Sequence, residues 1–333
     1  QGIRPFYNNY ASVNNWFPEI QLDHNALKDL RYQDCINLMA VGIRLADAVH
    51  TVSPSYKEDV LLPSRRPEFI GGESLENDLL KADNEGRLFG ILNASNYGNI
   101  RVAEKGLLYR NTVKALFRWL QENSKKYKAD FLAHTGEKIM QYVGNRPKFI
   151  VSSVARLTEQ KFYFLKRSPD AFEKMLVRLS EVDGIFMLLG TGDPDYEEFF
   201  RHMSYHHKNF VFTNGQSEDL IDSMYLETDL YFMPSLFEPC GISQMLAMRN
   251  GNPCLVHHTG GLKDTVEHLK TGFAFSGNTY DEQISNMVKS FDEALTIWEH
   301  DKDTWKKIKS NAKKVRFTWE KSLNEYYDKL YLL

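Results

Sequence analysis

The feature that most constrains the fold is a repeated alternation of short apolar runs with longer amphipathic stretches. Stretches such as 107–127 and 171–182 have helical spacing, whereas the apolar runs are rich in Val, Ile, Leu and Phe and mostly lead into turn-forming residues. The candidate strands are 48–52, 89–92, 149–154, 185–189, 209–212, 229–233 and 253–257. Strands that alternate with helices predict parallel sheets with helices on both faces, and such sheets bind ligands beyond the carboxyl ends of their strands.

Composition narrows the class of protein. The 333 residues are enough for two domains with separate cores, and 42% hydrophobic with 26% charged residues is ordinary for a globular chain. A formal net charge of −3 predicts no nucleic-acid partner and no membrane surface, and the lysines at 125–128 are most simply one solvated helical face. Since no run of about 18 apolar residues exists, we expect no transmembrane helix.

The cysteine and histidine patterns argue against metal and disulfide chemistry. Cys35, Cys240 and Cys254 are widely spread and form no CxxC pair, so neither a zinc site nor a disulfide framework is predicted. A reducing, cytoplasmic setting fits this usage best. The histidines lack the spacing of metal ligands, and the sequence places no base beside Cys240 that would make it a nucleophile.

A turn-prone segment at 144–147 marks the expected domain boundary. We expect residues 1–147 to form the later part of one Rossmann-like domain, beginning in a loop, and 148–310 to form a complete second one. The last segment, 311–333, should contain a closing helix. Its apolar face, spaced by three and four residues, must pack on something: it comprises Leu323, Tyr326, Tyr327, Leu330 and Tyr331.

Two loops after predicted strands carry candidate phosphate-binding residues. Arg156 and Lys161 lie five residues apart just past the strand at 149–154, where two cations could neutralise a departing diphosphate. Solvated surface cations are the simpler alternative. The second loop is a glycine turn containing Gly190, Gly192 and Asp193, and tight-turn geometry alone could explain it.

A third loop follows the strand at 229–233 and contains a lone glutamate, Glu238. It leads into an apparent helix at 243–250, whose first backbone N–H groups favour a phosphate. The carboxylate of Glu238 would then lie just outside that site and could accept hydroxyl hydrogen bonds. The next strand ends in Gly260 and Gly261, which would let the backbone approach a ligand closely.

These motifs resemble those of the bacterial glycogen synthases and plant starch synthases. The segments that carry the resemblance are SLFEPCGISQ (235–244), HTGGLKDTV (258–266), ARLTEQK (155–161), LLGTGDP (188–194), GIRLADAVHTVSPSY (42–56), GRLFGILNAS (86–95) and FTWEKSLNEYYDKLY (317–331). The match runs from about residue 20 to the end. It implies the GT-B fold, with two facing doubly wound domains, the first incomplete, and a closing helix that returns to the first domain.

The resemblance also implies roles for the loop residues. Glu238 would line the donor-sugar site, the loop from Cys240 to Ser243 would meet donor sugar and phosphate, and Arg156 with Lys161 would bind the leaving diphosphate. We therefore expect Glu238, Arg156 and Lys161 to be catalytic. The expected nucleotide-sugar-binding set is Gly190, Gly192, Asp193, Gly215, Gln216, Cys240, Gly241, Ile242, Ser243, Thr259, Gly260 and Gly261.

The implied activity is that of a retaining glucosyltransferase. It would move α-glucose from a nucleoside diphosphate glucose, with ADP-glucose favoured over UDP-glucose, to the non-reducing 4-hydroxyl of an α-1,4-glucan, without a cofactor. The alternative is a non-catalytic or truncated GT-B protein that binds nucleotide or glucan, or acts as a partner subunit. The family's lysine-glycine donor loop and catalytic histidine are absent from the chain, and Ala94, Phe162 and Gln216 replace its usual residues. We thus expect the 333-residue chain alone to be inactive. A phosphorylase using pyridoxal phosphate is a distant third hypothesis, without a recognisable cofactor-lysine segment.

Overall fold

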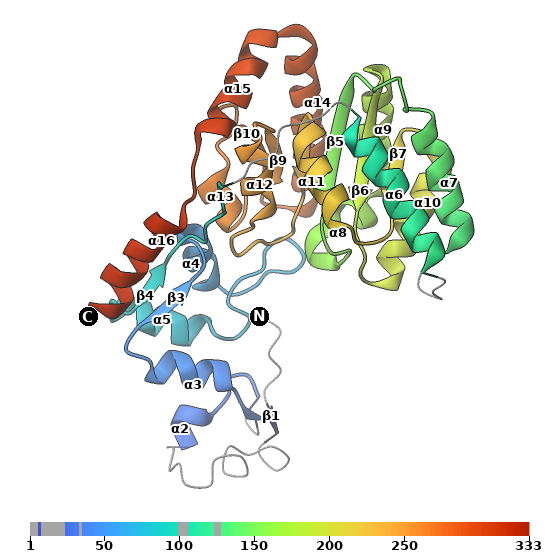
Figure 1. Cartoon of the computed structure of the whole chain (residues 1–333). Coiled ribbons are helices and arrows are strands. Elements are labelled where there is room, and N and C mark those ends of the chain that lie inside the picture. The colour runs from blue at the N-terminus through green and yellow to red at the C-terminus, as the bar shows by residue number, and fades with distance from the viewer. Residues whose placement is uncertain (1–5, 8–23, 33–34, 99–105, 123–127, 333) are drawn as a thin grey trace. The chain divides into compact units, whose positions relative to one another are not determined.

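The structure, a computed structural model, describes residues 6–7, 24–32, 35–98, 106–122 and 128–332 (Figure 1). Within these residues the chain forms two compact units: one ends at Ala94 and resumes at Trp319, and the other spans Ser95–Thr318. The loop expected at the start of the chain, and two lysines of the expected 125–128 cluster, lie outside the described residues. Among the described helices, none has the length and apolar character needed to cross a membrane.

The two units divide at other positions than the boundaries expected at 147 and 310. Helices α6 (Leu107–Gln121) and α7 (Ala129–Met140) precede residue 147, yet Trp119 and Leu132 on them share a core cluster with Ile150 of the second unit's sheet. At the other end, the amide of Phe317 donates to the hydroxyl of Tyr97 at 2.9 Å. A helix belongs to the unit whose core buries its apolar face. The turn at 144–147 marks a break in the chain but does not predict which core buries α6 and α7.

The second unit is built on one six-stranded sheet, in the order β10-β9-β8-β5-β6-β7, in which all neighbouring strands are parallel. The strands are β5 (Phe149–Val154), β6 (Gly184–Leu189), β7 (Phe210–Thr213), β8 (Leu230–Met233), β9 (Cys254–His257) and β10 (Gly272–Phe275). All but β10 coincide with expected strands. The strand order reverses between β5 and β8, because the chain runs outward through β6 and β7 and then outward again through β9 and β10.

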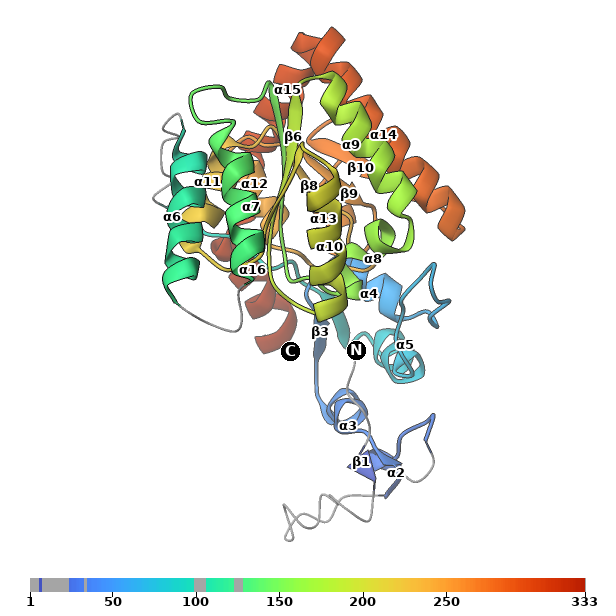
Figure 2. The same cartoon turned by 90° about the vertical axis from the view of Figure 1, so that its right-hand side faces the viewer.

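Helices cover both faces of this sheet, with α6 and α7 on one side and α9 and α10 on the other (Figure 2). Their bounds, after α6 and α7, are α8 (Glu159–Arg167), α9 (Pro169–Glu181), α10 (Pro194–His206), α11 (Glu218–Glu227), α12 (Ser243–Arg249), α13 (Gly261–Thr265), α14 (Tyr280–His300) and α15 (Lys302–Lys314). Prolines open α9 and α10, where their fixed φ suits the first helical turn. Because both faces are covered, the strands are mostly apolar and buried along their length, and buried residues do not alternate with exposed ones.

The first unit contains a two-stranded parallel sheet, β3 (Val49–Thr51) with β4 (Leu88–Gly90), and a short antiparallel pair, β1 (Phe6–Tyr7) with β2 (Cys35–Ile36). Its helices are α2 (His24–Leu27), α3 (Leu38–Leu45), α4 (Pro54–Val60), α5 (Glu76–Asn84), α16 (Trp319–Tyr326) and the π-helix η1 (Tyr327–Tyr331). The apolar residues of α3, α5 and β4 share one core cluster. Parallel strands packed with helices agree with the predicted doubly wound architecture, but the described parallel sheet of this unit has two strands of three residues each.

The closing helix returns to the first unit, as expected. The hydroxyl of Ser322 donates to the carbonyl of Leu92 at 2.7 Å, and the ring of Tyr326 meets that of His50 edge-on at 5.0 Å. The expectation that its whole apolar face packs is wrong. Leu323, Tyr327 and Tyr331 are 58%, 58% and 76% exposed.

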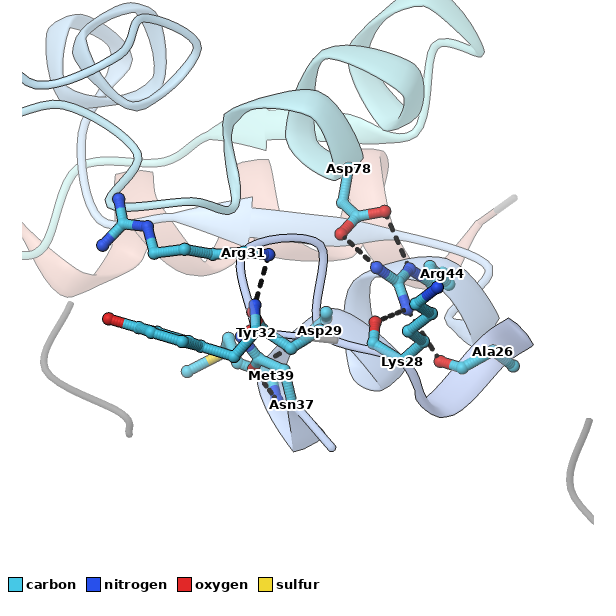
Figure 3. Close-up of polar contacts among 10 residues, drawn as sticks. Ala26, Lys28, Asp29, Arg31, Tyr32, Asn37, Met39, Arg44 and Asp78 are labelled. Carbon is cyan, nitrogen blue, oxygen red and sulfur yellow. Dashed lines mark hydrogen bonds and ion pairs between the residues drawn. The ribbon is translucent and has the colours of Figure 1, made fainter. Parts of the chain in front are cut away.

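A polar cluster fixes α3 in the first unit (Figure 3). Arg44 forms two parallel bonds with Asp78 of α5, at 2.8 and 2.7 Å, and donates to the carbonyls of Ala26 and Lys28 at 3.0 and 2.7 Å. Asn37 caps the start of α3, and its amide group is held by the carboxylate of Asp29 at 2.7 Å. Since Arg44 and Asp78 are only 16% and 10% exposed, each charge depends on the other.

We predict that Asp78→Asn weakens the first unit by about 3 kcal/mol, because it leaves the Arg44 guanidinium buried without its counter-charge. Native-state hydrogen exchange of amides in α3 and α5 would measure the free energy of local opening. The matched control is Glu58→Gln, which removes a 68% exposed carboxylate paired with Lys57 and should change stability by less than about 1 kcal/mol. Equal effects of the two substitutions would contradict the prediction.

Candidate active site

Two adjoining cavities lie at the carboxyl end of β5, beside the point where the strand order reverses. The larger has a volume of about 660 Å³ and the smaller about 260 Å³, and both are lined by Val154, Ala155 and Arg156. Arg156 itself is exposed and pairs with no carboxylate among the residues that the structure describes. A parallel sheet binds ligands at this position, because the loops after adjacent strands diverge there.

The larger cavity is polar on the side of α6 and the loop after β7. The carboxamide of Gln216 donates to the hydroxyl of Thr191 at 3.2 Å, while its backbone carbonyl accepts from Arg118 at 3.0 Å and from the Trp119 indole at 3.2 Å. Gly190 and Gly215 also line this cavity. A side chain at Gly215 would clash with the Trp119 ring, so packing requires glycine there. Sequence analysis missed Arg118 because it comes from a helix remote from any loop motif.

The smaller cavity is lined by Lys161, Ser235 and Ser243. The ammonium group of Lys161 forms an ion pair with Oε2 of Glu238, and the hydroxyl of Ser235 donates to the same oxygen at 3.0 Å. The side chains of Lys161 and Glu238 are 14% and 7% exposed. Both contacts use Oε2, so the other carboxylate oxygen, Oε1, has no bond to any described residue. Glu238 lies behind the cavity wall and reaches the cavity through Lys161 and Ser235.

Hydrogen bonds join the start of α8 to the loop after β8, and that loop to the segment after β9. The amide of Leu236 donates to the carbonyl of Gln160 at 2.8 Å, and the Gln160 carboxamide donates to the carbonyl of Phe237 at 3.1 Å. The amide of Gly261 donates to the carbonyl of Glu238 at 2.9 Å. This network holds the backbone on both sides of the Lys161–Glu238 ion pair.

The paired glycines after β9 are explained by the same network. A side chain at Gly260 would clash with the carbonyl of Glu238, and one at Gly261 would clash with the backbone of Cys240. Neither glycine, nor Thr259 before them, lines either cavity. Glycine is therefore required at both positions because the loop at 238–240 packs directly against their backbone.

The segment after Glu238 is fixed by Gln244 at the start of α12. The carboxamide of Gln244 donates to the carbonyls of Cys240 at 3.1 Å and Gly241 at 3.0 Å, and to the hydroxyl of Thr265 at 3.1 Å. Gly241 has φ +75°, a left-handed conformation that favours glycine. Cys240 is buried and Ile242 is exposed, and of this segment only Ser243 lines a cavity.

The glycine turn after β6 supports the loop that carries Arg156. Side chains at Gly190 and Gly192 would clash with the carbonyls of Ala155 and Leu157. Asp193 directly precedes α10 and, like Gly192, lines neither cavity. The turn and the Arg156 loop are thus packed backbone to backbone.

Phe162 stands where the resembled family prefers glycine. Its ring is 1% exposed and meets that of Phe200 on α10 edge-on at 5.1 Å. Its φ and ψ of −133° and 23° interrupt the helical conformation inside α8, directly after Lys161. The ring packs α8 against α10. The backbone of Lys161, the preceding residue, is therefore held by this core contact, while its side chain is held by the ion pair with Glu238.

His257, at the end of β9, holds the loop after β8 through a hydrogen bond to Ser235. Its Nδ1 lies 2.9 Å from the carbonyl of Ser235, to which it donates, and its ring stacks on that of Phe275 at 5.1 Å. Burial lowers the pKa of His257 from 6.5 to about 4, because a charged imidazole there would lose its hydration. The ring is therefore neutral at physiological pH.

We predict that this histidine makes the second unit sensitive to acid. Between pH 6.5 and 4 the unfolded chain takes up a proton that the folded chain does not, so the folded state loses up to about 3 kcal/mol as the pH falls. His257→Asn keeps a donor for Ser235 but has no titrating ring, and should flatten the fall in unfolding free energy over this range. The exposed His300→Asn is the control. An unchanged pH slope in His257→Asn would contradict the prediction.

Two family models match the chain. The one described as "Glycosyl transferases group 1" covers residues 137–315, and the one described as "Starch synthase catalytic domain" covers residues 1–81. The glycogen synthase of Streptococcus sanguinis is 34% identical over 304 residues, 90% of this chain and 59% of that protein. The glycogen synthase of Thermosipho africanus is 31% identical over 300 residues, 87% of this chain and 56% of that protein. The chain thus spans less than two thirds of the length of these relatives.

Solved structures give the same fold. The catalytic domain of starch synthase IV from Arabidopsis thaliana, bound to ADP and acarbose, is similar with a TM-score of 0.68 and 24% identity, over 93% of this chain and 61% of that one. Anabaena Alr3699/HepE, in complex with UDP and glucose, has a TM-score of 0.56 and 17% identity, over 88% and 65%. With a family match over more than half of its residues, the chain belongs to the group 1 glycosyl transferases, with the GT-B fold and the sequence features of the glycogen and starch synthases.

Proposed function

We propose that the protein is a retaining glucosyltransferase of α-1,4-glucan synthesis. It would transfer α-glucose from a nucleoside diphosphate glucose, with ADP-glucose favoured, to the non-reducing 4-hydroxyl of the growing chain. The similarity to proteins named glycogen synthase supports the reaction, and the ADP and acarbose in the starch synthase IV structure support the donor and acceptor classes. The observation that carries the proposal is the placement of Arg156 and Lys161 on two adjoining cavities.

The sizes and linings of the cavities suit the two halves of such a donor. The larger cavity has carboxamide, hydroxyl and guanidinium groups from Gln216, Thr191 and Arg118, which suit a nucleoside. Lys161 lines the smaller cavity. Arg156 lines both, so a diphosphate that joins nucleoside and sugar would pass along it.

The cations would act on the leaving group. As the bond from the anomeric carbon to the diphosphate breaks, negative charge grows on the phosphate oxygens, and fixed cations stabilise that charge without reorganising. Lys161 is held by its ion pair with Glu238, so its ammonium group is placed in advance. Glu238 lines neither cavity, so it would act on the transferred glucose through Lys161 and Ser235, which it holds in place.

Retention of configuration sets a further requirement on the acceptor. The new bond forms on the face of the anomeric carbon from which the diphosphate leaves, so the acceptor hydroxyl must lie beside the leaving group. A phosphate oxygen can then take the hydroxyl proton, and no separate protein base is needed. Close placement of donor and acceptor supplies the rest of the rate enhancement.

We predict that Lys161→Ala and Arg156→Ala, made in a protein that also carries the family's donor loop and catalytic histidine, each lower the rate of glucose transfer by about 100-fold, through loss of charge stabilisation of on the order of 3 kcal/mol. Calorimetric titration with ADP and with UDP would measure the accompanying loss of affinity and the base preference. Lys174→Ala, which removes an exposed cation of α9 outside both cavities, is the control. Unchanged nucleotide affinity in both variants would exclude the assigned diphosphate site.

We predict a different profile for Glu238→Gln. The neutral side chain no longer offsets the Lys161 charge, so affinity for ADP should stay equal or increase, whereas transfer should fall by at least about 100-fold because the lysine loses its fixed anionic partner. Glu159→Gln, at the exposed start of α8, is the matched control. Normal turnover in Glu238→Gln would show that the residue is only structural. Nucleotide binding without any primer elongation, by an unaltered protein that also carries the family's donor loop and catalytic histidine, would instead favour the non-catalytic alternative.

A further inference from the structure

The larger cavity of the candidate active site has no aromatic wall. Among the residues that the structure describes, no Phe, Tyr, Trp or His side chain lines it. Its apolar lining is aliphatic and consists of Val154, Ala155, Leu189 and Ile221. A nucleobase is a flat ring, and proteins commonly cover its face with an aromatic ring or with the guanidinium of an arginine. A base in this cavity would therefore have to use the second kind of partner.

Arg118 supplies a flat cation on this wall. Its Nη2 donates to the backbone carbonyl of Gln216 at 3.0 Å, and its Nε lies 3.7 Å from a carboxylate oxygen of Glu122. Within the described parts of the chain, Nη1 makes no hydrogen bond and no ring lies over the guanidinium. The side chain is 54% exposed. Two of the three nitrogens are thus engaged within the plane of the group, whereas its face is available to a ligand.

Helix α6 is held beside the cavity by bonds that need no ligand. The carboxamide of Asn111 donates to the carbonyl of Asp219 at 3.1 Å and to the hydroxyl of Ser223 at 2.6 Å. The buried indole of Trp119 donates at 3.2 Å to the same carbonyl that Arg118 bonds. Because both the helix and one end of the guanidinium are held, Arg118 would lose little conformational freedom when a base binds.

The other flat groups of the wall are less suited to a base. The guanidinium of Arg156 lines both cavities, which is the position of the diphosphate in the proposed function. The carboxamide of Gln216 is bonded to the hydroxyl of Thr191 at 3.2 Å and carries no charge. It therefore lacks the attraction that a cation has for the face of an aromatic ring. Arg118 is the flat cation that remains for the base.

We propose that Arg118 binds the base of the donor nucleotide by stacking its guanidinium on the face of the ring, and that this contact favours adenine over uracil. The inference rests on the proposed function, because it assigns a residue to the base of the same donor. A guanidinium over an aromatic face is attracted to the π-electrons of the ring. Adenine presents two fused rings to this group and uracil presents one, so the area of contact is larger for ADP than for UDP.

Calorimetric titration of the full chain with three ligands tests the proposal: ADP, UDP and inorganic pyrophosphate, which is a diphosphate without a base. Arg118→Ala should raise the Kd of ADP about tenfold and that of UDP about threefold, and leave that of pyrophosphate unchanged. Arg118→Lys keeps the charge but has no flat group, so it should resemble Arg118→Ala. Lys114→Ala removes an exposed cation of the same helix outside both cavities. It is the matched control and should change none of the three values.

The results separate this inference from the proposed function. If Arg118→Ala leaves the Kd of ADP unchanged, or weakens ADP and pyrophosphate equally, the stacking role is refuted. The second of these results would show that the residue only supports the loop after β7. A normal Kd of ADP in Arg118→Lys would show that charge alone is sufficient, and equal losses for ADP and UDP would refute the preference for adenine. In each of these cases the donor site stands. If the unaltered protein binds neither ADP nor UDP, the proposed donor is refuted and this inference with it.

Discussion

Reversal of the strand order between β5 and β8 is the constraint on which the candidate site depends. It makes these strands neighbours, so the segments that follow them meet at one edge of the sheet although 77 residues separate Lys161 from Glu238. The ion pair between the two side chains is buried, and a buried pair is favourable only if its remaining bonding groups are satisfied. The hydroxyl of Ser235 meets part of that condition at Oε2, and backbone bonds hold the segments that carry the two charged side chains.

The sequence predicted the elements of the sheet better than the limits of the units. Buried parallel strands are short apolar runs ending in turn residues, a pattern visible without any tertiary information. Strand β10 was not predicted because its sequence, GFAF, contains two small residues and gives a weak apolar run. The boundary near 147 could not be placed, since which sheet buries α6 and α7 is decided by long-range packing. For the same reason Arg118 was missed: it reaches the larger cavity from α6, far along the chain from the loops.

The glycine motifs were identified correctly, but the reason expected for them was incomplete. The pairs at 190 and 192 and at 260 and 261 suggested close approach of the backbone to a ligand. In the structure each of these glycines is needed because another loop's backbone lies against it, and only Gly190 also lines a cavity. The glycines shape the site indirectly, since they let the loops pack closely enough to hold Arg156, Lys161 and Glu238. Sequence alone cannot separate the two reasons, because both require the same missing side chain.

The buried ring of Phe162 makes the residue at this position difficult to replace. Its ring lies between α8 and α10, and removing a buried phenylalanine side chain costs about 3–5 kcal/mol unless the surroundings collapse into the space. A return to glycine would thus empty a place in the core immediately beside the lysine of the candidate site. Evolution could undo this replacement only together with changes in its neighbours, Phe200 among them. The packing of α8 against α10 thus couples residue 162 to Phe200, so the two positions constrain each other.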